Sequence, residues 1–135
     1  MQVIIYTNET GNVSVTVPTG EISIEEVLAK DCPLNAIIVD NSELPEEYND
    51  LFNAWELVEG KVIVNLDKAK LITKDRLRAE RTPLMLVQDV AYSRATETGA
   101  DTTAIIAEKN RLRDITKLAD TVATLEELKG LSCLA

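Results

Sequence analysis

Residues 67–99 read DKAKLITKDRLRAERTPLMLVQDVAYSRATETG, and over this segment apolar side chains recur with the spacing of an α-helix. One stripe of that helix holds Leu77, Leu84, Val87 and Ala91. These positions fall at i, i+7, i+10 and i+14, so a helix brings them to one side. The segment therefore predicts a long helix with one face turned toward a neighbouring element.

Two features of this segment concern how the helix begins and whether it is continuous. Asp67 is the expected N-cap, since a short acidic side chain can accept hydrogen bonds from the first N–H groups of a helix. Pro83 leaves two alternatives open. Either it kinks a single long helix, or Thr82 caps a new helix with Pro83 at its first position, where proline is tolerated.

A second helix is predicted after a tight reversal. Gly99 can adopt the positive φ angle with which many helices end, and Asp101 begins the next helix, which we expect to extend to residue 122. Its apolar stripe holds Ile105, Leu112, Ile115, Ala119 and Val122. Because the connection is short, the two helices should be antiparallel neighbours in a helical hairpin.

A short final helix completes this region. Thr124 and Glu127 have the spacing of a capping box, which marks the start of a helix. The apolar residues that this helix is expected to bury are Leu125, Leu128 and Leu131, and Gly130 lies at its end.

The chain before residue 67 alternates with the period of β-strands and predicts a small α+β lobe. Its predicted elements are a β-hairpin from MQVIIYTN (1–8) and NVSVTVP (12–18), a helix in SIEEVLAKD (23–31), a strand in NAIIVD (35–40) and a second hairpin in AWELVEGKVIVNLD (54–67). The continuous apolar run of the strand at 35–40 predicts burial on both faces, and Trp55 is the expected large core residue. The sequence thus predicts an α+β fold with an acidic α+β lobe at 1–66 and a helical hairpin lobe, including the short final helix, at 67–135.

Charge differs strongly between the two parts of the chain. Residues 1–60 carry 12 acidic side chains and one basic side chain, a net charge of −11, whereas residues 61–135 carry 13 basic and 11 acidic side chains. The acidic part would repel phosphates, so we expect no nucleic-acid partner for it. Basic residues crowd the start of the long helix: Lys68, Lys70, Lys74, Arg76, Arg78 and Arg81. Acidic residues interrupt them and no aromatic is interleaved, so packing near the acidic lobe, within the chain or across a dimer, is favoured over a nucleic-acid patch.

The residues available for chemistry are few. There is no histidine, which excludes Ser-His-Asp and Cys-His nucleophiles and His-ligated metals. Cys32 and Cys133 are isolated, which favours two reduced thiols over a disulfide between them. We therefore predict no catalytic, cofactor-binding or metal-binding residues and no enzyme activity. The chain has neither a long apolar span nor a signal peptide, so we expect no membrane partner and a cytosolic location.

Several segments in this order resemble a group of small proteins encoded by tailed bacteriophages, the tail assembly chaperone or tail-fibre assembly group. The matching segments are SIEEVLAKDCP (23–33), IIVDNSELPEEYNDLFNAWEL (37–57), VNLDKAKLITKDRLRAERTPLMLVQDVAYSRA (64–95) and NRLRDITKLADTVATLEELKGL (110–131). Within them, the pairs and triplets that carry the pattern are Leu44-Pro45, Ala54-Trp55, Asp67-Lys68-Ala69 and Leu112-Arg113-Asp114, together with Asp89. Pro83 and the unusually acidic first half depart from it.

The resemblance implies a non-enzymatic accessory protein of phage morphogenesis. Its partner would be a phage tail, tail-fibre or other virion protein, bound in the cytoplasm of the host cell during assembly. Two other classes remain as alternatives. One is a structural virion component that joins copies of a tail or capsid protein, and the other is an acidic inhibitor that mimics nucleic acid against a host defence protein.

The residues expected to contact a partner lie on the two long helices. Leu86, Val90 and Ile106 fall off the main stripes and give the helices a second apolar face. We expect this face to be a homodimer contact or the partner site. Arg111 and Arg113 lie on a charged face, for which a solvated surface and a partner surface are both open.

Overall fold

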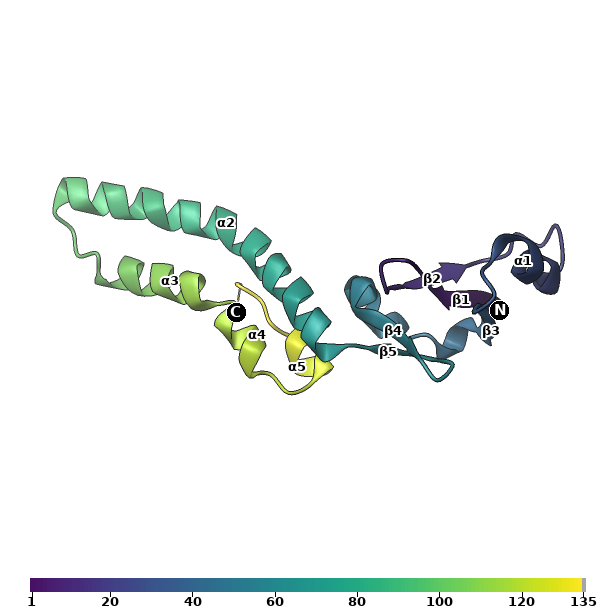
Figure 1. The fold of residues 1–135 in the computed structure, drawn as a ribbon. Coiled ribbons are helices and arrows are strands. Elements are labelled where there is room, and N and C mark those ends of the chain that lie inside the picture. Colours follow the sequence, from purple (N-terminus) through teal and green to yellow (C-terminus); the bar gives the residue numbers. More distant parts are fainter. Residues whose placement is uncertain (135) are drawn as a thin grey trace. The chain divides into compact units, whose positions relative to one another are not determined.

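A computed structural model describes residues 1–134, which form two compact units (Figure 1). The first unit is Met1–Ala69 and the second begins at Lys70. The boundary predicted from the sequence lies between residues 66 and 67. The α+β fold class is confirmed, since strands and short helices build the first unit and a helical hairpin with short helices builds the second.

The first unit contains two small antiparallel sheets. Its elements are β1 (Gln2–Thr7), β2 (Val13–Thr16), α1 (Ile24–Asp31), β3 (Ile37–Asp40), the 3-10 segments η1 (Asn41–Glu43) and η2 (Glu46–Ala54), β4 (Trp55–Val58) and β5 (Lys61–Val64). One sheet has the strand order β2-β1-β3, and the other pairs β4 with β5. Both predicted hairpins and the predicted short helix are confirmed. Ser23 is the N-cap of that helix, and its Oγ accepts a hydrogen bond from the backbone N–H of Glu26.

The central strand β1 supplies core residues to both faces of its sheet. Val3 and Ile5 pack in one cluster with Trp55, and Ile4 packs in a second cluster with Val27 of α1. Alternate side chains of a strand point to opposite faces, so one apolar run serves two clusters. The three-stranded sheet thus has apolar packing on each of its two faces.

Strand β3 corrects one prediction. Its apolar run predicted burial on both faces, but Ile37, Ile38 and Val39 are only half-buried. These side chains do contact both clusters, Ile38 on one side and its two neighbours on the other. However, β3 is an edge strand, and within residues 1–134 one of its long edges has no strand beside it. The apolar run of β3 correctly indicated a strand with both faces covered, but the fully buried side chains are those of the central strand β1.

Trp55 confirms its predicted place in the core. It is 2% exposed, and its Nε1 donates a hydrogen bond to the carbonyl oxygen of Tyr48 at 3.2 Å. The β4–β5 turn after it is formed by Glu59 and Gly60, with φ angles of 51° and 80°. Two successive positive φ angles are those of a type I′ turn, the common two-residue hairpin connection.

The second unit contains most of α2 (Leu66–Thr98), followed by α3 (Thr103–Asp114), α4 (Lys117–Thr121) and α5 (Leu125–Lys129). Figure 1 shows α2 and α3 side by side, running in opposite directions from a short connection, so the predicted helical hairpin is confirmed. Gly99 lies in this connection with a φ angle of 71°. Within residues 1–134, no helix combines the length and the apolar character needed to cross a lipid bilayer.

Helix α2 has a different cap from the expected one, and at Pro83 it follows the alternative of a single long helix. Its cap is Asn65 rather than Asp67, because the Asn65 side chain accepts from the backbone N–H of Lys68 at 3.1 Å. Asp67 lies in the first turn, where a negative charge also favours the helix. The helix then runs through Pro83 without ending. Thr82 does not cap a new helix, since its hydroxyl donates to the carbonyl oxygen of Arg78 one turn earlier, at 2.9 Å.

The second predicted helix is divided into α3 and α4. At the division, the N–H of Ile115 donates to the carbonyl oxygen of Leu112, a tightened turn that ends α3. Of the predicted apolar stripe, Leu112, Ile115 and Ala119 are buried, whereas Ile105 and Val122 are only half-buried. The predicted continuity of the helix was wrong. Helix α5 follows with Thr124 as its N-cap and with Leu128 fully buried.

The core of the second unit gathers where α2, the end of α3 and the segment around Cys133 meet. Its buried cluster contains Leu77, Leu112, Ile115 and Cys133, with Leu84, Met85 and Leu131 packed against it. Both Cys32 and Cys133 are free thiols, so the alternative of a disulfide between them is not realised. The short apolar segment around Cys133 therefore joins this core by packing rather than by a covalent bond.

Candidate protein-interaction surface

The helical hairpin is buried at its base only. Leu77 of α2 and Leu112 of α3 are fully buried, but none of residues 78–111 between them is. We call residues 78–111 the distal arm. Two helices that share no buried layer gain little stability from each other. The distal arm therefore holds much of its apolar surface in solvent.

The outer face of α2 in this arm is apolar and exposed. Leu86, Val87 and Val90 are 64%, 62% and 44% exposed, and Pro83 is exposed beside them. The four positions follow the i, i+3, i+4, i+7 spacing of a single helical stripe. We call Pro83, Leu86, Val87 and Val90 the α2 stripe. Contiguous exposed apolar residues of this kind are typical of a surface that binds another molecule.

Two shallow grooves lie on either side of Leu86. The proximal groove is lined by Arg81, Pro83, Met85, Leu86, Asp89 and Arg113, among others. The distal groove is lined by Leu86, Val87, Val90, Ala91 and Arg94. Both have aliphatic floors and arginine at the rim, so the surface offers apolar contact and positive charge together.

The charges around the grooves are unevenly paired. All six arginines of the chain lie in the second unit. Three of them are in ion pairs, with the pairs Arg76–Glu80, Arg78–Asp75 and Arg111–Glu108. The other three, Arg81, Arg94 and Arg113, make no ion pair within residues 1–134, and these three line the grooves. Asp89, the carboxylate of the proximal groove, is paired with Lys109 at 2.8 Å.

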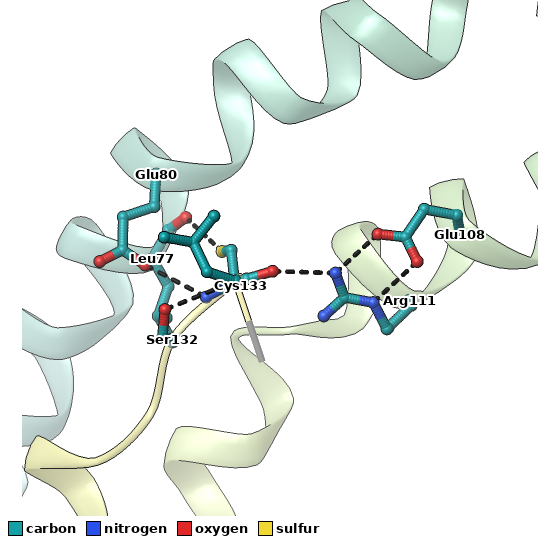
Figure 2. Close-up of polar contacts among 7 residues, drawn as sticks. Leu77, Glu80, Glu108, Arg111, Ser132 and Cys133 are labelled. Carbon is teal, nitrogen blue, oxygen red and sulfur yellow. Dashed lines mark hydrogen bonds and ion pairs between the residues drawn. The ribbon is translucent and has the colours of Figure 1, made fainter. Parts of the chain in front are cut away.

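Arg111 is engaged within the protein. Figure 2 shows its guanidinium between Glu108 and the backbone of Cys133. Its Nε and Nη2 donate to the two carboxylate oxygens of Glu108 at 2.9 and 2.6 Å, and Nη2 also donates to the carbonyl oxygen of Cys133 at 2.9 Å. These bonds lower the pKa of Glu108 and raise the pKa of Arg111. Arg111 therefore ties α3 to the segment around Cys133.

Residues 131–134, which we call the strap, are also fastened to α2. The backbone N–H of Cys133 donates to Glu80 at 3.2 Å, and its thiol donates to the carbonyl oxygen of Leu77 at 3.3 Å (Figure 2). Arg76 donates to the carbonyl oxygen of Leu131 at 2.7 Å. Burial raises the pKa of the Cys133 thiol, with Glu80 adding to the effect, so the thiol is protonated and a poor nucleophile. The strap is structural and fixes the base of the hairpin.

The structure brings together some of the residues predicted to contact a partner. Leu86 and Val90 share the distal groove, and Leu86 and Arg113 share the proximal groove. Ile106 of α3 is 43% exposed but lines neither groove. Arg111 belongs to the strap network instead.

The position of Val87 corrects one prediction, and Val87 was also missing from the residues predicted to contact a partner. It was assigned to the packing stripe of α2, yet it is among the most exposed apolar residues of the arm. At 3.6 residues per turn, Val87 lies about 80° around the helix from Leu77, whereas Leu84 lies only about 20° away. The same geometry puts Val87 beside Pro83 and Val90, so the sequence was sufficient to assign Val87 to the second apolar face.

The described part of the chain holds no grouping of cysteine, aspartate and glutamate that could bind a metal ion. Comparison with protein-family models, with curated proteins and with solved structures finds no match to this chain. The geometry and charge of the distal arm are therefore the grounds on which a function can be argued.

Proposed function

We propose that this protein is a non-enzymatic assembly protein that binds another protein through the α2 stripe. One observation carries the proposal: Leu86, Val87 and Val90 are exposed on one side of an arm in which no residue is buried. A partner that covers this stripe removes apolar surface from water, which is the main driving force of protein association. An amphipathic helix face presented in this way is a common means of protein recognition.

The size of the stripe favours a transient complex. The exposed fractions of its Leu and Val residues together equal between one and two fully exposed side chains. Since full burial of one such side chain stabilises by about 1.5–3 kcal/mol, covering the stripe contributes about 2.5–5 kcal/mol. Association itself costs about 4–15 kcal/mol in lost freedom. A complex held by the stripe alone is therefore weak, which suits a helper that releases its partner better than a permanent joint in a particle.

On the resemblance of residues 23–33, 37–57, 64–95 and 110–131, we propose that the partner is a phage tail, tail-fibre or other virion protein. Binding would take place in the host cytoplasm during assembly. The weakness of a complex held by the stripe alone supports an assembly helper over a structural virion component. Mass spectrometry of purified mature particles tests this choice: absence of the protein supports the helper, and stoichiometric presence overturns it.

The binding site itself is tested by charge placed on the stripe. Leu86→Glu with Val90→Glu should abolish recovery of the partner when the tagged chain is captured from cells that assemble the particles. Leu71→Glu is the matched control, because Leu71 lies on the same helix, is 63% exposed and is outside the stripe. Circular dichroism should show equal helicity for all forms. Unchanged partner recovery with the double substitution would refute the proposed site.

A further inference from the structure

We infer that the segment bound on the α2 stripe is an amphipathic helix of another protein with carboxylates at both ends of its apolar face. This inference rests on the proposed function and names the chemistry of the partner. It is carried by the ion pairs of the arginines. The arginines at the grooves have no carboxylate partner within residues 1–134, whereas the other arginines of the unit have one.

The unpaired arginines occupy the two ends of the stripe. Arg81 and Arg113 lie at the proximal groove and Arg94 lies at the distal groove, while the remaining three arginines have carboxylate partners. The one carboxylate at the proximal groove, Asp89, is taken by Lys109. The rim is therefore positive at both ends, and a bound segment meets the least electrostatic cost when it brings negative charge to both.

Two of these arginines are held in position before a partner arrives. Nη1 of Arg81 donates to the carbonyl oxygens of Leu112 and Arg113, at 3.3 and 3.1 Å, and Nη1 of Arg113 donates to the side chain of Asn110 at 3.1 Å. A guanidinium has five N–H donors, so donors remain on each for a carboxylate. Side chains that are already ordered lose less entropy when they bind.

The spacing of the charges sets the length of the partner helix. Arg81 and Arg94 are thirteen positions apart on α2, which corresponds to about 20 Å along a helix axis. A partner helix that lies along α2 therefore needs carboxylates about three to four turns apart, with aliphatic side chains between them on the same face.

A second copy of this chain is a poor occupant of its own stripe. In an antiparallel pair, Arg94 of each copy would meet Arg81 and Arg113 of the other, and in a parallel pair each arginine would meet its equivalent. Both arrangements place like charges together at the two ends of a small apolar contact, which is unfavourable. Nucleic acid fits no better, because the groove floors are aliphatic and offer no aromatic ring for stacking of bases.

The test is a displayed library of helical peptides selected for binding to the full chain. Each peptide carries Leu and Ala on one face, and all residue types are allowed one turn before and one turn after that face. We expect Asp and Glu to be enriched at both flanking positions. A selected acidic peptide should bind roughly tenfold more tightly than its Lys-flanked version, a difference of one well-formed charge contact.

Charge reversal in the protein completes the test. Arg94→Glu and Arg113→Glu should each weaken the acidic peptide by roughly tenfold and strengthen the Lys-flanked peptide. Arg78→Glu is the matched control on α2, since its exposed pair with Asp75 is outside the grooves, and it should change affinity by no more than about twofold.

The failures of the two proposals can be told apart. If peptides bind and Leu86→Glu abolishes their binding, but neutral or basic flanks are enriched, the inference is wrong and the proposed binding site stands. If no helical peptide binds, both are wrong. A dimer in sedimentation that Leu86→Glu dissociates would overturn the inference in favour of a second copy. A short DNA duplex whose binding depends on Arg94 and Arg113 more strongly than that of the peptides would overturn it in favour of nucleic acid.

Discussion

Replacing Arg111 with Met separates a structural role from an interaction role for this residue. Met keeps an apolar side chain of similar length but removes the bonds to Glu108 and to the carbonyl oxygen of Cys133. A hydrogen bond from a charged donor contributes about 1.5–3 kcal/mol, and the partial exposure of this guanidinium puts it at or below the lower end of that range. The exposed ion pair with Glu108 adds about 0.5 kcal/mol. We therefore expect Arg111→Met to lower the free energy of unfolding by about 1–2 kcal/mol.

The assay is thermal unfolding followed by the helical circular dichroism signal. For a unit of this size, the loss corresponds to a fall in Tm of roughly 5–10 °C. Glu108→Gln is the control, because it weakens the ion pair but leaves the bond to Cys133, and it should cost only about 0.5 kcal/mol. The pKa of Glu108 is lowered in the folded protein, so its contribution is present above the ordinary value and is lost as pH falls through the folded pKa. An unchanged Tm of Arg111→Met, together with lost partner binding, would refute this reasoning and restore Arg111 as an interaction residue.

Three further outcomes are expected. Trp55→Ala should destabilise the first unit by about 3–5 kcal/mol in denaturant unfolding, because it empties a large buried site; an unchanged midpoint would contradict the burial of Trp55. Leu112→Ala should lower the free energy of unfolding by about 2–5 kcal/mol, whereas Leu86→Ala should leave it almost unchanged. Equal losses for the two variants in denaturant unfolding would show that the distal arm has a buried core. The pKa of the Cys133 thiol is raised on folding, so its contribution to the free energy of unfolding is complete below the unfolded pKa and is lost as pH rises through the folded pKa. If a Cys133→Ala variant loses as much stability at alkaline pH, the Cys133 thiol is not the cause.

Local signals allowed much of the fold to be predicted. Ser23 and Thr124 cap helices as their spacing indicates, and Glu59-Gly60 forms the predicted turn. These features depend on residues within one turn of each other. The choice of β1 as the central strand depends on pairing with both Val13–Thr16 and Ile37–Asp40, which lie far apart along the chain, and no local pattern reveals it.

The binding surface could be predicted in part for the same reason. Leu86 and Val90 were visible as a second apolar face, because helical spacing is a local property. The engagement of Arg111 with Cys133 spans 22 positions and needed the folded chain. Which arginines form ion pairs was predictable only in part. Arg81 and Arg113 have no carboxylate three or four positions away, so their lack of an ion pair could be expected. Arg94 has Glu97 three positions away but makes no ion pair with it in the described chain.

The confinement of the core to the base of the hairpin has a consequence for how the hairpin unfolds. Amide groups near Leu77, Leu112 and the strap are protected by buried packing and by bonds from three side chains, so their exchange with solvent deuterium requires opening of the whole unit. Amides of residues 86–107 need only local fraying, because no residue of this range is buried and none of the contacts that fasten the base lies within it. The local stability of the hairpin thus decreases from its base to its far end. Its far end can loosen and re-form around a partner while the base stays folded and holds the register of α2 against α3.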